Sequence, residues 1–275
     1  MSSEERVKAA FNEQARICER LGSPFTAHLL HTLARWLHRA TPVGSAILDW
    51  GGDPGILRDN LPLRVAGALH ALARARGREP GLAALYPPAP LPAEEPLYRA
   101  VEHAFRRHAP EILLFLRRAP QANEPGRSSL LLAGLLALSA RLQPRAIALL
   151  EPGASAGLNL VPDRYRHQFG RASWGPAGAA LQLAPEWHGP APPVDARLAI
   201  ASRRACDLEP LDLREAADRA RLAAYVWADQ PLRLQRLEQA IAAAAAGEPP
   251  QVESADRSAG SRCGCSNRPP RARCA

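Results

Sequence analysis

The stretch Gly153–Gly157 reads GASAG and follows a short apolar segment that ends in Glu151. Its spacing, G-x-S-x-G, is that of a nucleophile elbow, in which a serine stands on a tight strand-to-helix turn. The same residues also fit a glycine-rich loop whose backbone, rather than a serine hydroxyl, meets a ligand. The residues elsewhere in the sequence are therefore needed to distinguish a nucleophilic serine from a ligand-binding loop.

A serine hydrolase would need an acid and then a histidine after Ser155. Only His167 and His188 follow it, and both come before the next strand candidate. Upstream, where earlier strands and an oxyanion loop should lie, the pattern is helical. A serine hydrolase that acts through Ser155 therefore stays an alternative.

The cofactor interpretation uses more of the same residues. The pattern E-x-G-x-S-x-G from Glu151 to Gly157 is a variant of the E/D-x-G-x-G-x-G loop of S-adenosylmethionine-dependent methyltransferases. Ser155 replaces the middle glycine, which such a loop tolerates if φ stays negative at that position. The helix expected after the loop would offer unpaired backbone N–H groups to a ligand.

A second element of such a site is an acid at the end of the next strand, which accepts hydrogen bonds from ribose hydroxyls. Asp207 fits that place. Fifty residues separate Gly157 from Asp207, where about twenty are usual. The segment Asp163–Pro193, rich in tryptophan and proline, would then loop out as an insertion.

The polar run Asn123–Ser128 precedes an apolar helix. Interpreted locally, it is a turn with Ser128 or Asn123 as the helix cap. Interpreted functionally, it places Glu124 and Arg127 at the mouth of the glycine loop, where Arg127 binds a carboxylate of the cofactor or substrate. Both interpretations stay open.

Other polar and aromatic residues have ordinary interpretations. His28 and His31 lie three residues apart without a nearby carboxylate pair, so we expect no metal site there. Asp163 and Tyr165 form either a solvated helix end or part of an adenosine or substrate pocket. Three tryptophans are expected to be core or loop anchors rather than stacking platforms: Trp174, Trp187 and Trp227.

Residues 1–143 are expected to form a helical region. A capping box at Ser2–Glu5 opens the first helix, which stops at Gly22, and Ser23 with Pro24 at the first turn starts the second. Further helices are expected in the segments Asn60–Gly77, Tyr98–His108 and Glu111–Arg118, with a buried helix at Arg127–Leu142.

Residues 144–251 change to an α/β pattern. Ala146–Glu151 is a short apolar run between two prolines, as in a buried strand. Val194–Cys206 contains a second strand candidate, ARLAIA, and Asp212 would cap a helical region, Arg214–Ala246, that breaks at Asp229–Pro231. We expect an α/β fold: a helical N-terminal region followed by a Rossmann-like, methyltransferase-like unit.

Residues 252–275 lack apolar periodicity and hold three of the five cysteines. They are expected to be an irregular or disordered tail. One C-x-C with no second pair is too little for a zinc site, and no cysteine spacing suggests a disulfide framework. Because this tail cannot supply further strands, the α/β unit is expected to be incomplete at its C-terminal end.

The composition narrows the class of partner. The net charge is +8, but Lys8 is the only lysine among 35 basic residues, and the arginines are scattered among acids and apolar residues. This pattern argues against nucleic-acid binding. The longest apolar run, Leu130–Leu138, is shorter than a membrane span, and the charged N-terminus has no signal-peptide pattern. We expect a cytoplasmic protein with a small-molecule ligand.

Five long strings of the sequence are specific enough to indicate a family: Gly22–Phe25, Gln121–Ser128, Leu149–Tyr165, Cys206–Asp212 and Tyr225–Gln230. Through them, and along most of its length, the chain resembles a bacterial family known as domain of unknown function 2332. The resemblance implies no established activity, and its Rossmann-like half looks like a methyltransferase core. Members continue beyond residue 255 into further strands and a histidine-bearing segment, where this sequence departs from them.

The sequence thus predicts an S-adenosylmethionine-binding, methyltransferase-like protein. The alternatives are a serine hydrolase and a non-catalytic ligand-binding or interaction protein. No catalytic base and no metal ligand is identified, and neither the methyl acceptor nor the oligomeric state can be derived. The expected cofactor-binding residues are Glu151, Gly153, Ser155, Gly157, Asn159, Asp207, Glu124 and Arg127.

Overall fold

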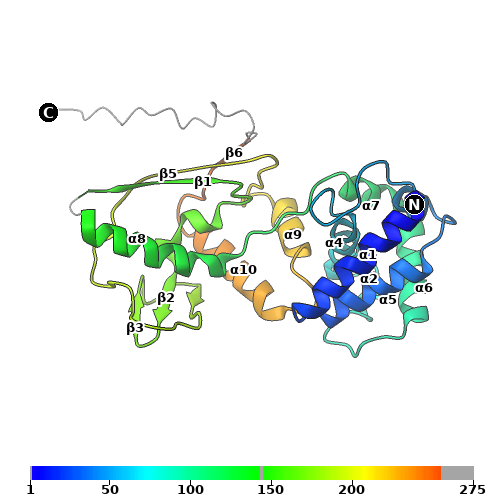
Figure 1. The fold of residues 1–275 in the computed structure, drawn as a ribbon, viewed down its shortest axis with the longest axis horizontal. Helices are drawn as coiled ribbons and strands as arrows, with labels where there is room; N and C mark the ends of the chain where they lie inside the picture. Colours follow the sequence, from blue (N-terminus) through cyan, green and yellow to red (C-terminus); the bar gives the residue numbers. More distant parts are fainter. Residues whose placement is uncertain (1, 143–144, 255–275) are drawn as a thin grey trace. The chain divides into compact units, whose positions relative to one another are not determined.

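The computed structural model of the chain describes residues 2–142 and 145–254. It divides into two compact units (Figure 1). The first, here called the helical unit, comprises Met1–Ala122 and Ala220–Leu234. The second, the α/β unit, comprises Asn123–Arg219 and Gln235–Ala275. The chain passes into the helical unit within helix α9 (Ala216–Ala224) and leaves it within α10 (Pro231–Ala245).

Helices that are close in sequence build most of the helical unit. The first opens on the expected capping box. The helices at Leu61–Arg74, Glu94–Arg107 and Ala109–Leu116 lie close to the predicted segments. Those at Pro42–Leu48 and Pro80–Ala83 were not expected. The helices are α1 (Ser3–Arg20), α2 (Pro24–Trp36), α3 (Pro42–Leu48), α4 (Leu61–Arg74), α5 (Pro80–Ala83), α6 (Glu94–Arg107) and α7 (Ala109–Leu116).

Neighbouring residues determine both ends of α1. The Ser2 side chain accepts from the backbone N–H of Glu5, and the Glu5 carboxylate accepts from the N–H of Ser2, which completes the predicted capping box. At the other end, Gly22 adopts a φ of 76°, and the Ser23 N–H bonds to the carbonyl of Cys18 at 2.9 Å. This left-handed glycine closes α1 and reverses the chain.

The start of α2 differs from the expectation. Ser23 occupies the N-cap position, but its side chain makes no capping bond and donates instead to Asp229. The other Asp229 oxygen accepts from the backbone N–H of Phe25 at 2.7 Å. The predicted serine cap is therefore wrong, and the cap comes from a residue more than 200 positions later.

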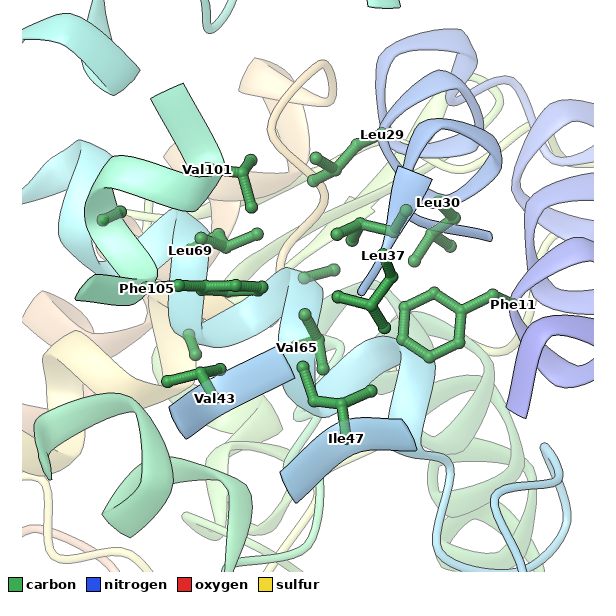
Figure 2. Packing of buried hydrophobic residues seen from close by; sticks show 14 of the residues in the cluster. Phe11, Leu29, Leu30, Leu37, Val43, Ile47, Val65, Leu69, Val101 and Phe105 are labelled. Atoms are coloured by element: carbon green, nitrogen blue, oxygen red, sulfur yellow. The ribbon is translucent and has the colours of Figure 1, made fainter. Parts of the chain in front are cut away.

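One hydrophobic core fills the helical unit. Figure 2 shows side chains from α1, α2, α3, α4 and α6 meeting in it. All of them are almost completely shielded from solvent, so the apolar stripe of each helix finds a partner. The labelled members are Phe11, Leu29, Leu30, Leu37, Val43, Ile47, Val65, Leu69, Val101 and Phe105.

The α/β unit is built on a parallel sheet of three strands in the order β1-β5-β6. These are β1 (Ile147–Pro152), β5 (Ile200–Asp207) and β6 (Val252–Ser254). The two predicted strands are present, although the second begins later than ARLAIA. Val252–Ser254, expected to belong to an irregular tail, instead pair in parallel with β5. The rest of that segment lies outside the described residues.

Strand β1 is less buried than its composition suggested. Its residues alternate between half-buried and exposed, and Leu150 is 57% exposed. On one side it pairs with β5, Glu151 lying opposite Ala205. The parallel pairing brings the ends of both strands, and the loops that follow them, to the same edge of the sheet.

The predicted insertion does not simply loop out. It contains a small sheet of β2 (Arg166–Phe169), β3 (Ala172–Trp174) and β4 (Gln182–Leu183) in the order β3-β2-β4. Phe169 of this sheet packs with Leu132 and Leu136 of α8 (Ser128–Leu142). Trp174 and Trp187 pack against the same cluster, as expected of anchors.

Helix α8 has two apolar faces, of which one is buried and the other exposed. Leu132 and Leu136, one turn apart, are buried in the cluster with Phe169. Leu130, Leu131 and Leu138 are between 42% and 65% exposed. The expectation of a buried helix is therefore wrong for this second face, which lies alongside β1 in Figure 1 and borders the hollow described below.

Two helices precede β6, as the helical pattern after β5 predicted. Asp212 does not cap the first of them, because α9 begins only at Ala216; its carboxylate instead accepts a hydrogen bond from the backbone N–H of Arg214 at 2.9 Å.

The elements together give the fold class: α/β with a helical N-terminal region. Within the described residues, no helix combines the length and apolarity needed to span a bilayer.

Candidate small-molecule site

The glycine loop joins the end of β1 to two short 3₁₀ turns, η2 (Leu158–Leu160) and η3 (Pro162–Arg164). Gly153 and Gly157 adopt left-handed φ values of 70° and 73°. The N–H groups of Gly153 and Ala154 both donate to the carbonyl of Cys206, at 2.7 and 3.2 Å. The loop is therefore fastened to the neighbouring strand end by its own backbone.

The expected helix after the loop is absent from the described residues. In its place, the N–H of Leu158 donates to the side-chain oxygen of Asn123 at 2.9 Å, and the N–H of Leu160 to the carbonyl of Gly157 at 3.0 Å. The hypothesis that a helix N-terminus presents unpaired donors is thus wrong here. Asn123, whose local interpretation was a cap for the helix that follows it, holds the glycine loop instead.

Ser155 also departs from the expectation. Its φ is 55°, in the left-handed region that disfavours side chains, whereas a negative value was expected. The residue is 3% exposed, and its Oγ is buried without a hydrogen-bond partner among the described residues. Ser155 shapes the loop and presents no exposed hydroxyl.

The histidines of the hydrolase alternative lie elsewhere in the unit. His167 places Nδ1 at 3.1 Å from Ser129 Oγ and Nε2 at 2.7 Å from the carbonyl of Pro162. His188 pairs with Glu186 on an exposed loop. The structure brings neither imidazole into hydrogen-bond contact with Ser155.

Asp207 stands at the end of β5, as predicted, and its carboxylate contacts the loop. One oxygen accepts from the N–H of Ser155 at 2.8 Å, and the other from the N–H of Glu209 at 3.0 Å. These bonds tie together the segments that follow β1 and β5. Asp207 is thus a positioning residue for the loop, a role that the motif alone did not reveal.

A hydrogen-bonded chain connects Glu151 to the start of α8. The hydroxyl of Ser128 donates to Asn159 Oδ1 at 2.8 Å, and the Asn159 side chain hydrogen-bonds to Glu151. With its oxygen occupied by Ser128, Asn159 turns its amide N–H group toward the Glu151 carboxylate. The asparagine and the serine therefore fix the orientation of this acid.

Burial raises the pKa of Glu151, although the bond from Asn159 and the charge of Arg127 both oppose the shift. Its Oε2 is buried and has no hydrogen-bond partner among the described residues. A buried carboxylate oxygen without a donor is energetically costly. This acid is therefore suited to meet a donor that a ligand brings.

Glu151, Asn159 and Arg127 line one hollow of about 590 Å³ in the α/β unit. This volume lies in the range of small-molecule sites. Apart from these three polar residues, the wall is apolar and comes from the exposed face of α8 and from β1 and η2. The remaining lining residues are Leu130, Leu131, Gly134, Leu135, Leu138, Leu149, Leu150 and Leu160.

Arg127 and Glu124, the two charged residues of the run before α8, have different surroundings. Arg127 is exposed and lines the hollow, and its predicted contact with a ligand carboxylate stays a prediction. Glu124 does not line it: its carboxylate accepts from the N–H of Gly126 and from Arg236, both at 3.1 Å. Glu124 therefore holds the turn before α8 and ties it to α10.

The other candidates have structural partners. Asp163 makes a two-bond ion pair with Arg203, at 2.9 and 2.7 Å, and the hydroxyl of Tyr165 donates to the carbonyl of Leu158. His31 bonds to Asn12. No group of three or more metal-ligating side chains occurs in the described part of the chain.

Sequence reasoning missed the leucines of α8. Their spacing marks two faces of one helix, but the sequence does not say which face is covered. The feature that emerges is an apolar hollow with an acid, an amide and an arginine at the end of a parallel strand. It belongs to an α/β unit carrying a glycine loop.

The chain belongs to the family described as an uncharacterized protein conserved in bacteria, DUF2332, whose model matches residues 8–259. This confirms the family resemblance. No curated protein and no solved structure matches the chain.

Proposed function

We propose that the α/β unit binds S-adenosylmethionine in the hollow between α8 and β1 and is a methyltransferase-like protein. The observation that carries the proposal is the buried, unpartnered Oε2 of Glu151 in the wall of an apolar hollow that Arg127 and Asn159 also line. Such a hollow suits a ligand with an apolar body and a few polar groups.

The strand order of the parallel sheet supports the same location for the ligand. Consecutive parallel strands that add outward, as in β1-β5-β6, also occur in one half of a doubly wound sheet. Ligands of such sheets bind outside the carboxyl ends of the strands. Glu151, the glycine loop and Asp207 all lie at that edge.

The residues present fit the cofactor in different ways. Glu151 and Asn159 supply an oriented acceptor and donor, Arg127 supplies a cation, and the leucines exclude water from the apolar part of a ligand. Gly153, Gly157, Ser155 and Asp207 set the shape of the loop. The cofactor would supply an activated methyl group, and the chain would contribute proximity and orientation.

Calorimetric titration of S-adenosylmethionine and S-adenosylhomocysteine into the full chain tests the proposal. We expect micromolar affinity, lost in Gly134→Phe, because Gly134 lines the hollow and an added Cβ there is unobstructed, so that the ring would fill the ligand's place. Gly178→Phe, in a loop where the added Cβ is equally unobstructed, is the matched control. No binding by the folded chain, or equal binding by both variants, would refute the assignment.

The serine hydrolase stays a weaker candidate, because the exposed nucleophile and the histidine contact that it needs are both lacking at Ser155. A fluorophosphonate probe tests it directly. Labelling that disappears in Ser155→Ala would favour a hydrolase over the cofactor proposal. Ligand binding without methyl transfer to any acceptor would favour the non-catalytic alternative.

A further inference from the structure

The hollow of the α/β unit holds two opposite charges that do not pair with each other. Arg127 lies at the start of α8 and Glu151 at the end of β1, and both line the hollow. The positive charge of Arg127 acts on Glu151, yet no ion pair within 4 Å joins them. The hollow therefore separates a cation from an anion.

Each of these charges also lacks a strong protein partner. Among the described residues, no side chain or carbonyl accepts a hydrogen bond from the Arg127 guanidinium, whereas other arginines, such as Arg203, are held by two or more bonds. Glu151 receives only the bond from Asn159, and its Oε2 has no donor. A guanidinium is built to bind a carboxylate through two parallel bonds.

The ligand that satisfies both residues carries both charges. A simple anion would meet Arg127 but would face the carboxylate of Glu151, and a simple cation would have the opposite problem. A zwitterion neutralises both, and a carboxylate and an ammonium attached to one carbon form the most compact example. The leucines of α8 and β1 then cover an apolar group attached to the same carbon.

We propose that the hollow recognises a zwitterionic α-amino acid group with an apolar body, the carboxylate on Arg127 and the ammonium on Glu151. Asn159 and Ser128 act as positioning residues, because they hold the Glu151 carboxylate in place. This inference deepens the proposed function and rests on it, since it concerns the same hollow. The amino acid group has two sources: the end of an adenosyl cofactor, or a free amino acid.

Four probes distinguish these sources by calorimetry on the full chain. S-adenosylhomocysteine carries a nucleoside and the amino acid group, 5′-methylthioadenosine carries the nucleoside alone, and L-methionine and L-leucine carry the amino acid group alone. We expect S-adenosylhomocysteine to bind at least about tenfold more tightly than 5′-methylthioadenosine. If instead the free amino acids bind as tightly as S-adenosylhomocysteine, they are the source.

Charge-neutral variants locate the recognition. Arg127→Gln and Glu151→Gln should each weaken S-adenosylhomocysteine about 10- to 100-fold and leave 5′-methylthioadenosine unchanged. The matched controls are Arg171→Gln and Glu186→Gln, on the exposed surface away from the hollow, which should change neither affinity. Circular dichroism checks that each variant is folded.

The outcomes separate the inference from the proposed function. Equal affinity for S-adenosylhomocysteine and 5′-methylthioadenosine, unaffected by either variant, would overturn the zwitterion and leave the cofactor proposal standing. Binding of amino acids but of neither nucleoside would overturn the cofactor and support the zwitterion. Binding of no probe to the folded chain would overturn both.

Discussion

The carboxylate of Asp207, the last residue of β5, accepts a hydrogen bond of 2.8 Å from the backbone N–H of Ser155, in the loop after β1. Its second oxygen accepts from Glu209. The acid that sequence reasoning assigned to a ribose thus connects two loops at the carboxyl edge of the sheet.

Replacing Asp207 should therefore destabilise the protein even without a ligand. Asp207→Ala leaves the N–H groups of Ser155 and Glu209 without these acceptors, and we expect the free energy of unfolding to fall by about 2 kcal/mol. Urea denaturation measures it. Asp195→Ala, an exposed aspartate before β5, is the control. An Asp207→Ala chain as stable as this control would favour a pure ligand role.

The left-handed φ of Ser155 predicts an unusual gain from glycine. Ser155→Gly removes the cost of a side chain at a φ of 55° and deletes a buried, unpartnered hydroxyl. We expect the free energy of unfolding to rise by about 1 kcal/mol, with ligand affinity retained, because the loop acts through its backbone. A loss of stability would show that the hydroxyl has a structural partner.

Gly157 gives the opposite case in the same loop. An added Cβ would lie 2.8 Å from Pro250 Cβ and 3.2 Å from Val252 Cγ2, at a φ of 73°. Gly157→Ala should lower the free energy of unfolding by about 2 kcal/mol. Thermal unfolding of Ser155→Gly and Gly157→Ala, measured side by side, tests both predictions. A Gly157→Ala chain as stable as the unmodified one would contradict the close packing of Pro250 and Val252 against Gly157.

Local patterns predicted the features that local physics controls. The capping box at Ser2, the glycine stop at Gly22 and the strand before the glycine loop each depend on neighbouring residues, and all are present. The position of Asp207 at a strand end followed from the same kind of pattern.

What the sequence did not predict depends on contacts between distant segments. The backbone N–H of Ser155, a residue with a φ of 55°, is bound by the carboxylate of Asp207, 52 positions later. The apolar residues of α8 predicted a buried helix, because periodicity alone cannot say that one face stays open. Arg127 and Glu151 line the same hollow only because α8 lies alongside β1 (Figure 1).

The helical unit should lose stability as the pH falls through the range set by His70. Its Nδ1 donates to the carbonyl of Ala224 at 3.1 Å, its ring stacks on Tyr86, and burial lowers its pKa to about 4. An unfolded histidine titrates near 6.5, so between these values only the unfolded chain binds the proton. This contribution is complete above about pH 6.5 and is lost toward pH 4.

His70→Phe keeps a ring against Tyr86 and removes the titrating group. Its free energy of unfolding should therefore fall less steeply between about pH 6.5 and 4, by up to about 1.4 kcal/mol per pH unit relative to the unmodified chain. Chemical denaturation across a pH series gives the two slopes. Parallel slopes would mean that His70 is solvated, contrary to its burial.

Asp229 should matter more for stability than its place in a helix-breaking turn suggests. Its two oxygens accept from the Ser23 hydroxyl and the Phe25 N–H, so it caps α2 in place of the Ser23 side chain. Asp229→Ala removes both bonds and should lower the free energy of unfolding by about 1–2 kcal/mol. Asp229→Asn keeps one acceptor and should cost less, because only the charge and one bond are lost. Ser23→Ala removes a single bond and leaves the Phe25 N–H bonded to Asp229, so its loss of unfolding free energy should be similar to that of Asp229→Asn. If Ser23→Ala lost as much stability as Asp229→Ala, the serine rather than Asp229 would be the cap of α2.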